Sequence, residues 1–436
     1  MKNNIVVVII YFLTGVFVTA PIITIDVAGR LVSVFSILFA LLYILALWFA
    51  FDAKKNININ SISLAFIGWY ILALIASIAG VIYFGFDSLW LNQIMSYIPK
   101  IFLYLTLLLY VMKWHDGSYA LAAFFKGFFY GCIANLIWSV VEGLYYYTFN
   151  DTLNDALFLE YVKTLPDDRR YMTVVADGII RASGFNIDPA HLGVIIPIIF
   201  VYALFRRNLY LIALSLSSLV FSGSTTAAMT SMLATMISLG KFELHQIKLK
   251  SIGITMLAIF VVVVGLLTND FVRESVFKNA KGFYERTTEN YVSNSDQGPR
   301  YVYHAYLPDA IYFNGFKTLT GSGFGTASHP YVDNPDINVN LDEEHRPYDP
   351  ESTYISYLFD TGFLGLLFYL FVLISSIMFY RKRIHFGFTE LIIYSSLCGI
   401  LFSGFFYHYT LTAYQVLILT FSVVGRNSLL IFKDEQ

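Results

Sequence analysis

Two arginines and a glutamate in this chain have the chemistry needed to act on a phosphate ester. Arg181 begins an Arg-Ala-Ser-Gly segment, Arg300 follows a Gly-Pro pair, and Glu351 stands just before a long apolar stretch. Arginine side chains donate paired hydrogen bonds that fit phosphate oxygens, and a carboxylate can accept the proton of an attacking hydroxyl group. Together they favour attack by a sugar hydroxyl on a sugar carried by a lipid diphosphate. The arginines would then stabilise the charge on the leaving diphosphate.

Five further polar side chains near these three are expected to contact the substrate. They are Asp188, His191, His345, Arg346 and Tyr354. Simpler structural interpretations stay open. Asp188 stands directly before a proline, which is typical of the start of a helix, and Arg181 could bind lipid head groups. Arg300 could form an ordinary salt bridge in a loop. Glu351 could cap the helix that follows it, in which case His345 is a nearby alternative base.

Small residues form two further motifs. Ser222-Gly-Ser-Thr-Thr226 carries hydroxyl groups that either let helices pack closely or line a polar cavity. The glycines of Gly321-Ser-Gly323-Phe-Gly325 predict turns with positive φ and a close approach of the backbone. This motif is not a dinucleotide fingerprint, because no strand and helix of a Rossmann unit surround it. The histidines show no metal-ligand spacing, so neither a metal nor another cofactor is expected.

The composition places these residues in a membrane protein. The 436 residues are 57% apolar and only 13% charged, and the mean hydropathy is +0.64, whereas soluble domains carry about 25% charged residues. A chain of this length with so few charges could not cover its surface in water, which excludes a cytosolic enzyme and a disordered protein. The net charge of −2 provides no basic surface for nucleic acid. Cys132 and Cys398 lie inside apolar runs and are expected to be core residues.

We expect an all-α integral membrane protein with about twelve transmembrane helices, since each helix needs about 20 apolar residues to cross the hydrocarbon layer. The expected spans are 4–23, 31–51, 62–83, 93–112, 119–146, 187–205, 208–221, 224–240, 251–268, 354–380, 388–406 and 408–425. The expected organisation has three parts. They are helices 1–9 over 1–268 with an outer loop near 147–186, a large loop over 269–353, and helices 10–12 with the C-terminus over 354–436.

Lysine and arginine residues predict which side of the membrane each loop occupies. With the N-terminus inside, the inner segments hold Lys2, Lys54, Lys55, Lys113, Arg206, Arg207, Lys241, Lys248, Lys250, Arg381, Lys382, Arg383, Arg426 and Lys433. The short outer loops hold only Arg30. Because cytoplasmic loops are enriched in such residues, we expect both termini inside and both long loops outside. The second long loop, over 269–353, is rich in Tyr, Phe and Gly, which favours a folded helical domain that caps the outer side of the membrane helices. Short amphipathic helices are expected there, such as one around Phe271–Tyr291.

These features together resemble the bacterial O-antigen polymerases and the related O-antigen ligases. The matching segments are Arg181-x-x-Gly184 followed by Pro189 and Gly193, Ser222-x-Ser224-Thr, Arg300 upstream of Gly321-x-Gly323-x-Gly325, and Glu351-Ser-x-Tyr-x-x-x-Leu-x-x-x-Gly362-x-x-Gly365. The likeness covers residues 180–370 and the pattern of spans around a large, late outer loop.

The resemblance implies a GT-C-like, metal-independent glycosyltransferase of the bacterial inner membrane with its active site at the periplasmic face. It would transfer a growing glycan from undecaprenyl diphosphate to the next lipid-linked repeat unit, with a flippase and a chain-length regulator as partners. Arginines at the positions of Arg181 and Arg300 are the implied diphosphate ligands. Ligases of this family tend to have His-Asn where this chain has Glu351-Ser352, which favours the polymerase. A lipid-linked oligosaccharide flippase or transporter is the other alternative, because Lys100 and Lys126 fall in or near spans.

Overall fold

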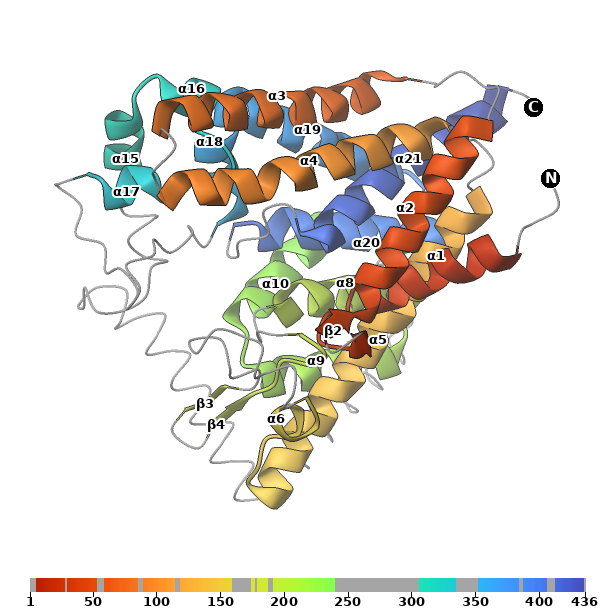
Figure 1. Cartoon of the computed structure of the whole chain (residues 1–436). Helices are drawn as coiled ribbons and strands as arrows, with labels where there is room; N and C mark the ends of the chain where they lie inside the picture. The colour runs from red at the N-terminus through yellow and green to blue at the C-terminus, as the bar shows by residue number, and fades with distance from the viewer. Residues whose placement is uncertain are drawn as a thin grey trace. The chain divides into compact units, whose positions relative to one another are not determined.

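In the part of the chain that the structure describes, the regular elements are helices and two short hairpins, as the computed structural model in Figure 1 shows. The structure describes residues 5–27, 30–52, 59–84, 89–113, 118–158, 174–176, 179–186, 191–239, 306–334, 352–383, 387–405 and 412–434. Within these ranges four helices are long and apolar enough to cross a membrane. They are α3 (Ser61–Phe84), α4 (Leu89–Lys113), α5 (Ser118–Phe149) and α19 (Gly362–Arg381). The expected helical architecture is confirmed, and these four helices are compatible with a membrane-embedded protein.

The remaining helices divide into further apolar helices and small helices. The other apolar helices are α1 (Ile5–Phe17), α2 (Val34–Asp52), α8 (Leu192–Arg206), α9 (Leu209–Ser222), α10 (Thr225–Leu239), α20 (Phe388–Ser403) and α21 (Ala413–Asp434). The small helices are α6 (Leu153–Leu157), α15 (Leu307–Asn314), α16 (Lys317–Thr320), α17 (His329–Val332) and α18 (Thr353–Asp360). The expected span 251–268 and the expected amphipathic helix around Phe271–Tyr291 lie outside the described residues.

Two antiparallel hairpins were not expected from the sequence. Strand β1 (Thr24–Val27) pairs with β2 (Arg30–Ser33), and Thr24 lies opposite Ser33. Strand β3 (Val174–Ala176) pairs with β4 (Ile179–Arg181), and Val174 lies opposite Arg181. Both hairpins follow the end of a helix and precede the start of another, so they shape connections and add no sheet to the core.

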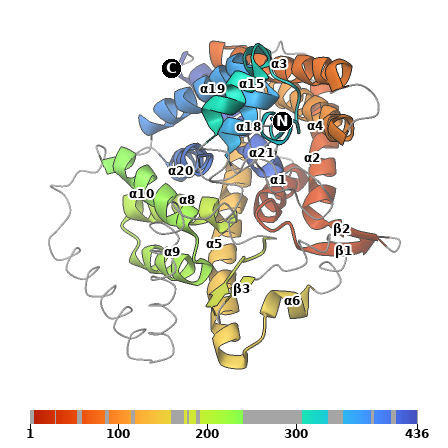
Figure 2. The ribbon, with the colours of Figure 1, turned by 90° about the vertical axis from the view of Figure 1, so that its left-hand side faces the viewer.

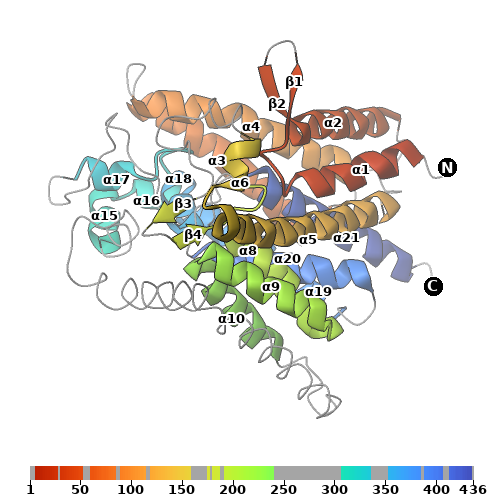
Figure 3. The ribbon, with the colours of Figure 1, turned by 90° about the horizontal axis from the view of Figure 1, so that it is seen from below.

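The chain forms two compact units, which we describe separately. The first unit comprises residues 1–7, 40–122 and 294–436, and the second comprises residues 8–39 and 123–293. In the second unit α1 and α5 lie against each other at glycines (Figure 3). A Cβ atom on Gly127 would lie 2.8 Å from the carbonyl carbon of Phe12, and one on Gly15 would lie 2.7 Å from the nitrogen of Phe128. The absence of side chains at these positions therefore lets the two backbones touch.

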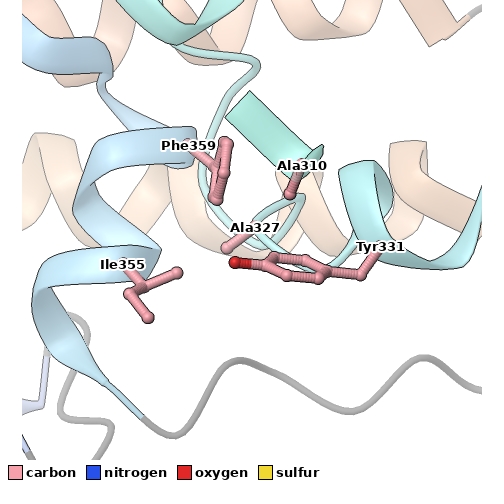
Figure 4. Packing of buried hydrophobic residues seen from close by; sticks show 5 residues of the cluster. All are labelled: Ala310, Ala327, Tyr331, Ile355 and Phe359. Atoms are coloured by element: carbon pink, nitrogen blue, oxygen red, sulfur yellow. The ribbon is translucent and has the colours of Figure 1, made fainter. Parts of the chain in front are cut away.

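An aromatic core organises the first unit. Trp69 of α3 is fully buried and packs edge-on against Phe324 at 6.2 Å and against Tyr357 of α18 at 5.3 Å between ring centroids. Tyr369 of α19 joins this cluster at 5.7 Å from Trp69. A smaller core beneath α15 and α17 is shown in Figure 4. Its members are Ala310, Ala327, Tyr331, Ile355 and Phe359.

The stretch expected as one span over 354–380 is two helices. Helix α18 ends at Asp360, and α19 begins at Gly362, which has a φ of +75°. Positive φ cannot continue a right-handed helix, and glycine adopts it without steric cost. The backbone of Gly321 fills the break, since its nitrogen lies 2.6 Å from the position of a Cβ atom on Gly362. The prediction of a continuous helix was wrong because this tertiary contact favours a break.

Candidate functional site

Figure 2 shows α9 and α10, the two helices of the second unit on either side of the turn at Gly223. Arg181 lies against this turn. It is the last residue of β4, and the next residue, Ala182, donates its backbone N–H to the carbonyl of Phe221 at 3.0 Å. The Cγ atom of Arg181 is 3.8 Å from the position that a Cβ atom on Gly223 would occupy. The structure therefore brings the Arg181 segment together with the Ser222–Thr226 motif.

The Ser222–Thr226 motif builds this turn and the amino end of α10. The hydroxyl oxygen of Ser224 accepts the backbone N–H of Ala227 at 3.2 Å, which is the hydrogen bond of a helix N-cap. A Cβ atom on Gly193 of α8 would lie 3.0 Å from Cγ2 of Thr226, so α8 and α10 approach closely here. These contacts support the packing interpretation of the hydroxyl residues.

The neighbourhood of Arg181 carries positive charge from two sources. The amino end of α10, a helix of 15 residues, presents backbone N–H groups and the positive end of the helix dipole. Arg181, at a partly exposed position, has its side-chain stem beside the turn that precedes this end. Gly223, beside the arginine stem, has a φ of +54°, a conformation that glycine adopts without steric cost. An anion, and a phosphate group in particular, is the ligand that such a pair of groups favours.

A buried carboxylate holds the segment that follows Arg181. Glu142 of α5 is fully buried, and its Oε2 atom accepts the backbone N–H groups of Ser183 and Gly184, each at 3.1 Å. Gly184 has a φ of +66°, and a Cβ atom there would lie 2.9 Å from Oδ1 of Asn135. The segment therefore makes a tight turn against α5 that requires glycine.

Two buried asparagines complete this anchor. Asn135 of α5 accepts the backbone N–H of Phe185 at 2.9 Å and donates to the carbonyl of Thr19 at 2.7 Å. Asn154 of α6 donates to the carbonyl of Gly184 at 2.8 Å and accepts from Nε1 of Trp138 at 2.7 Å. Side chains from two helices thus fix the backbone directly after Arg181. We call Glu142, Asn135 and Asn154 the anchor residues.

The sequence prediction missed the anchor residues, although a signal for them was present. Glu142 and Asn135 lie within the apolar stretch expected as the span 119–146. Ionisable residues inside a membrane helix are costly, so each one deserves a functional interpretation. What the sequence did not show was which backbone groups they bind, because the partners are 41 and 50 residues away along the chain.

Of the other predicted site residues, the structure describes His191 and Tyr354. His191 is partly exposed and directly precedes α8, where it makes no side-chain capping hydrogen bond. Tyr354 is buried in α18 of the first unit, and its hydroxyl group donates to the carbonyl of Leu401. The predicted residues outside the described part of the chain are Asp188, Arg300, His345, Arg346 and Glu351.

The glycine motif of the first unit has the conformation that the sequence predicts. Gly321, Gly323 and Gly325 have φ values of +84°, +101° and +86°. The N–H of Gly323 donates to the carbonyl of Asp360 at 3.0 Å, and the N–H of Thr326 donates to the Asp360 carboxylate at 3.2 Å. The motif therefore lies against the break between α18 and α19, and its hydrogen bonds to Asp360 hold it there.

A histidine–aspartate pair lies close to this motif. His329 of α17 is hydrogen-bonded through Nδ1 to Asp333, and its ring is surrounded by aromatic residues, of which Phe84 and Trp90 are nearest at 4.8 and 5.5 Å. Burial lowers the pKa of His329 below its ordinary value, Asp333 raises it by a smaller amount, and Lys317 lowers it. The net lowering favours the neutral imidazole. The described residues contain no group of three His, Cys, Asp or Glu side chains that could hold a metal ion.

No protein-family model matches this sequence, and no curated protein matches it significantly.

Proposed function

We propose that the protein is a membrane glycosyltransferase that polymerises a surface polysaccharide. It transfers the growing glycan from undecaprenyl diphosphate to the hydroxyl group of the next lipid-linked repeat unit. The observation that supports the proposal is the position of the Arg181 stem against Gly223, in the turn that leads into α10. A cation and a helix amino end at one place suit the diphosphate of the donor, which must be bound and stabilised as it leaves.

The anchor residues support this assignment. A diphosphate ligand must meet a guanidinium group in a fixed position, because misplacement of a binding group by about 1 Å can cost about 100-fold in rate. Glu142, Asn135 and Asn154 bind the backbone of residues 183–185, directly after the residue that follows Arg181. Burying three polar side chains in an apolar helix bundle costs free energy. A need to hold the loop after Arg181 in one rigid position would explain this cost.

We also propose the membrane topology that the sequence predicts. Twelve spans, cytoplasmic termini and two long outer loops in the bacterial inner membrane would put the carboxyl end of α5, and with it Glu142, near the periplasmic surface. The lipid diphosphate of a periplasmic donor lies at that level. In the mechanism that the family resemblance implies, Glu351 would accept the proton of the acceptor hydroxyl group, and Arg300 would be a further ligand of the diphosphate.

The test is the length of the surface glycan in a deletion strain. The strain is complemented with the wild-type gene, Arg181→Ala, Arg181→Lys, Arg300→Ala or Glu351→Gln, and protein levels are matched by immunoblot. Arg207→Ala is the control, because Arg207 is an exposed arginine at the carboxyl end of α8. We expect a ladder of chain lengths from the wild type and the control. Arg181→Ala, Arg300→Ala and Glu351→Gln should give single capped units, and Arg181→Lys a weakened ladder.

Two outcomes would contradict the proposal. If the deletion removes all surface glycan, including the single unit, the protein is a flippase or a ligase. If Arg181→Ala retains the full ladder at normal protein level, Arg181 does not bind the donor diphosphate.

A further inference from the structure

Helices α15 and α16 expose large apolar side chains although neither is long enough to span a membrane. Tyr312, Phe313, Phe316 and Leu319 are 89%, 42%, 75% and 48% exposed. We call these four residues the α15–α16 patch. They fall within residues 306–320, in the stretch that the sequence assigns to an outer aqueous loop. Four large exposed apolar residues this close together mark an interaction site, because soluble surfaces rarely present such patches.

The opposite side of the same two helices is packed. Ala310 is fully buried in the small core with Tyr331 and Phe359 (Figure 4), and Asn314 and Thr318 are also buried. The two helices therefore have one side fixed to the protein and one apolar side directed away from it. This is the pattern of a helix that lies at a boundary between protein and an apolar phase.

The patch is continuous with exposed apolar residues of two helices that are long enough to span a membrane. Helix α16 packs against the beginning of α19, where the carbonyl carbon of Leu319 lies 2.6 Å from the position of a Cβ atom on Gly362. The next two residues of α19, Phe363 and Leu364, are exposed. Figure 1 shows α15 and α16 at one end of α3 and α19. Exposed apolar residues near that end of α3 include Ile78 and Ile82.

A cation and a tyrosine mark the polar border of this surface. The Nζ atom of Lys317 lies 3.1 Å from the centroid of the Tyr83 ring, at the end of α3. Tyrosine is enriched at the level of the lipid head groups, and lysine extends its charge toward them while its stem lies along apolar surface. Phe316 directly precedes Lys317, and Leu319 follows it by two residues, so this lysine and two residues of the patch belong to one short segment.

We propose that the α15–α16 patch inserts into the membrane leaflet at this end of α3 and α19. Its occupant is the lipid bilayer itself, with Phe316 and Tyr312 among the upper acyl chains and Lys317 at the phosphate level. The segment that carries the patch is thus embedded in the membrane on one side and packed against the core around Tyr331 on the other. This inference does not depend on the proposed function.

The test is the accessibility of nitroxide labels in nanodiscs of phosphatidylcholine that hold one copy of the full-length chain. Labels are attached to Tyr312→Cys and Phe316→Cys, both at exposed positions where a cysteine disturbs no core contact. Leu367→Cys, exposed on α19, is the lipid reference, and Asp151→Cys, exposed after α5, is the aqueous reference. The native cysteines are buried, and unsubstituted protein measures any labelling of them.

We expect the ratio of oxygen to nickel-complex collisions at positions 312 and 316 to approach that at Leu367 and to exceed that at Asp151. A ratio equal to that at Asp151 at both positions would show that the patch faces water and would overturn the proposal. Labels immobile and shielded from both reagents would show that protein covers the patch, because each nanodisc holds a single chain. That result would also overturn it.

Discussion

Removing the carboxylate of Glu142 should release the loop that carries Arg181. Its Oε2 atom accepts two backbone N–H groups at 3.1 Å, and the side chain is fully buried. A hydrogen bond to a charged group contributes roughly 1.5–3 kcal/mol, and an orphaned buried donor adds its own desolvation cost. In Glu142→Ala both Ser183 and Gly184 lose their acceptor, so we expect a local destabilisation of about 3–5 kcal/mol.

Hydrogen exchange measures this effect where it occurs. Because each 1.4 kcal/mol is a factor of ten in an equilibrium constant, a peptide covering residues 181–186 should exchange about 100- to 4,000-fold faster in Glu142→Ala. Glu142→Gln keeps an acceptor of the same shape and should exchange about tenfold faster than the wild type, since a neutral acceptor forms weaker hydrogen bonds. In the polysaccharide assay, Glu142→Ala should shorten the ladder in the same way as Arg181→Ala.

The matched control is Ser139→Ala in the same helix. Ser139 is buried, and its hydroxyl group forms hydrogen bonds with Ser218 of α9 at 2.6 Å and with the carbonyl of Leu136 at 2.9 Å. This variant tests whether any polar deletion in α5 loosens the loop. If Glu142→Ala leaves the exchange of 181–186 at the wild-type rate, the carboxylate does not anchor the loop. If Ser139→Ala accelerates the exchange equally, the effect is a general loosening of α5.

Three further predictions follow from the glycines and from His329. Gly321→Ala should destabilise the protein by about 2–4 kcal/mol, because Gly321 has a positive φ and a Cβ atom there would lie 2.7 Å from the carbonyl carbon of Thr361. Gly68→Ala is the control in the same thermal-unfolding assay and should be neutral, because there is open space around Gly68. Gly127→Ala should cost about 1–3 kcal/mol by separating α1 from α5, and an unchanged Tm would contradict that helix contact. Because the pKa of His329 is lowered from 6.5, the unfolded chain binds more protons, so stability should fall as the pH drops below about 6.5. A pH series of Tm values should show a smaller decline in His329→Gln, and an equal decline would exclude this histidine as the cause.

The sequence by itself determined the class of the protein and the conformation of its special glycines. Low charge and long apolar stretches require a helical membrane protein, because backbone groups inside a bilayer must be satisfied within each helix. The spacing of Gly321, Gly323 and Gly325 predicts positive φ, because only glycine adopts it without a steric penalty. Both properties are local, so each can be inferred from a short stretch of chain.

The tertiary structure decided which distant residues meet. Helix periodicity does not indicate that Glu142 binds the backbone after Arg181, or that Arg181 lies on the turn before α10. It also does not indicate that the stretch 354–380 breaks at Gly362, because the propensity of the residues is helical and the break is stabilised by Gly321. Apolar sequence specifies that side chains are buried, and it carries little information about their partners, since hydrophobic contacts are not directional. The positions of Arg181 and its anchor residues depend on hydrogen bonds across the fold, which exist only once the helices have packed.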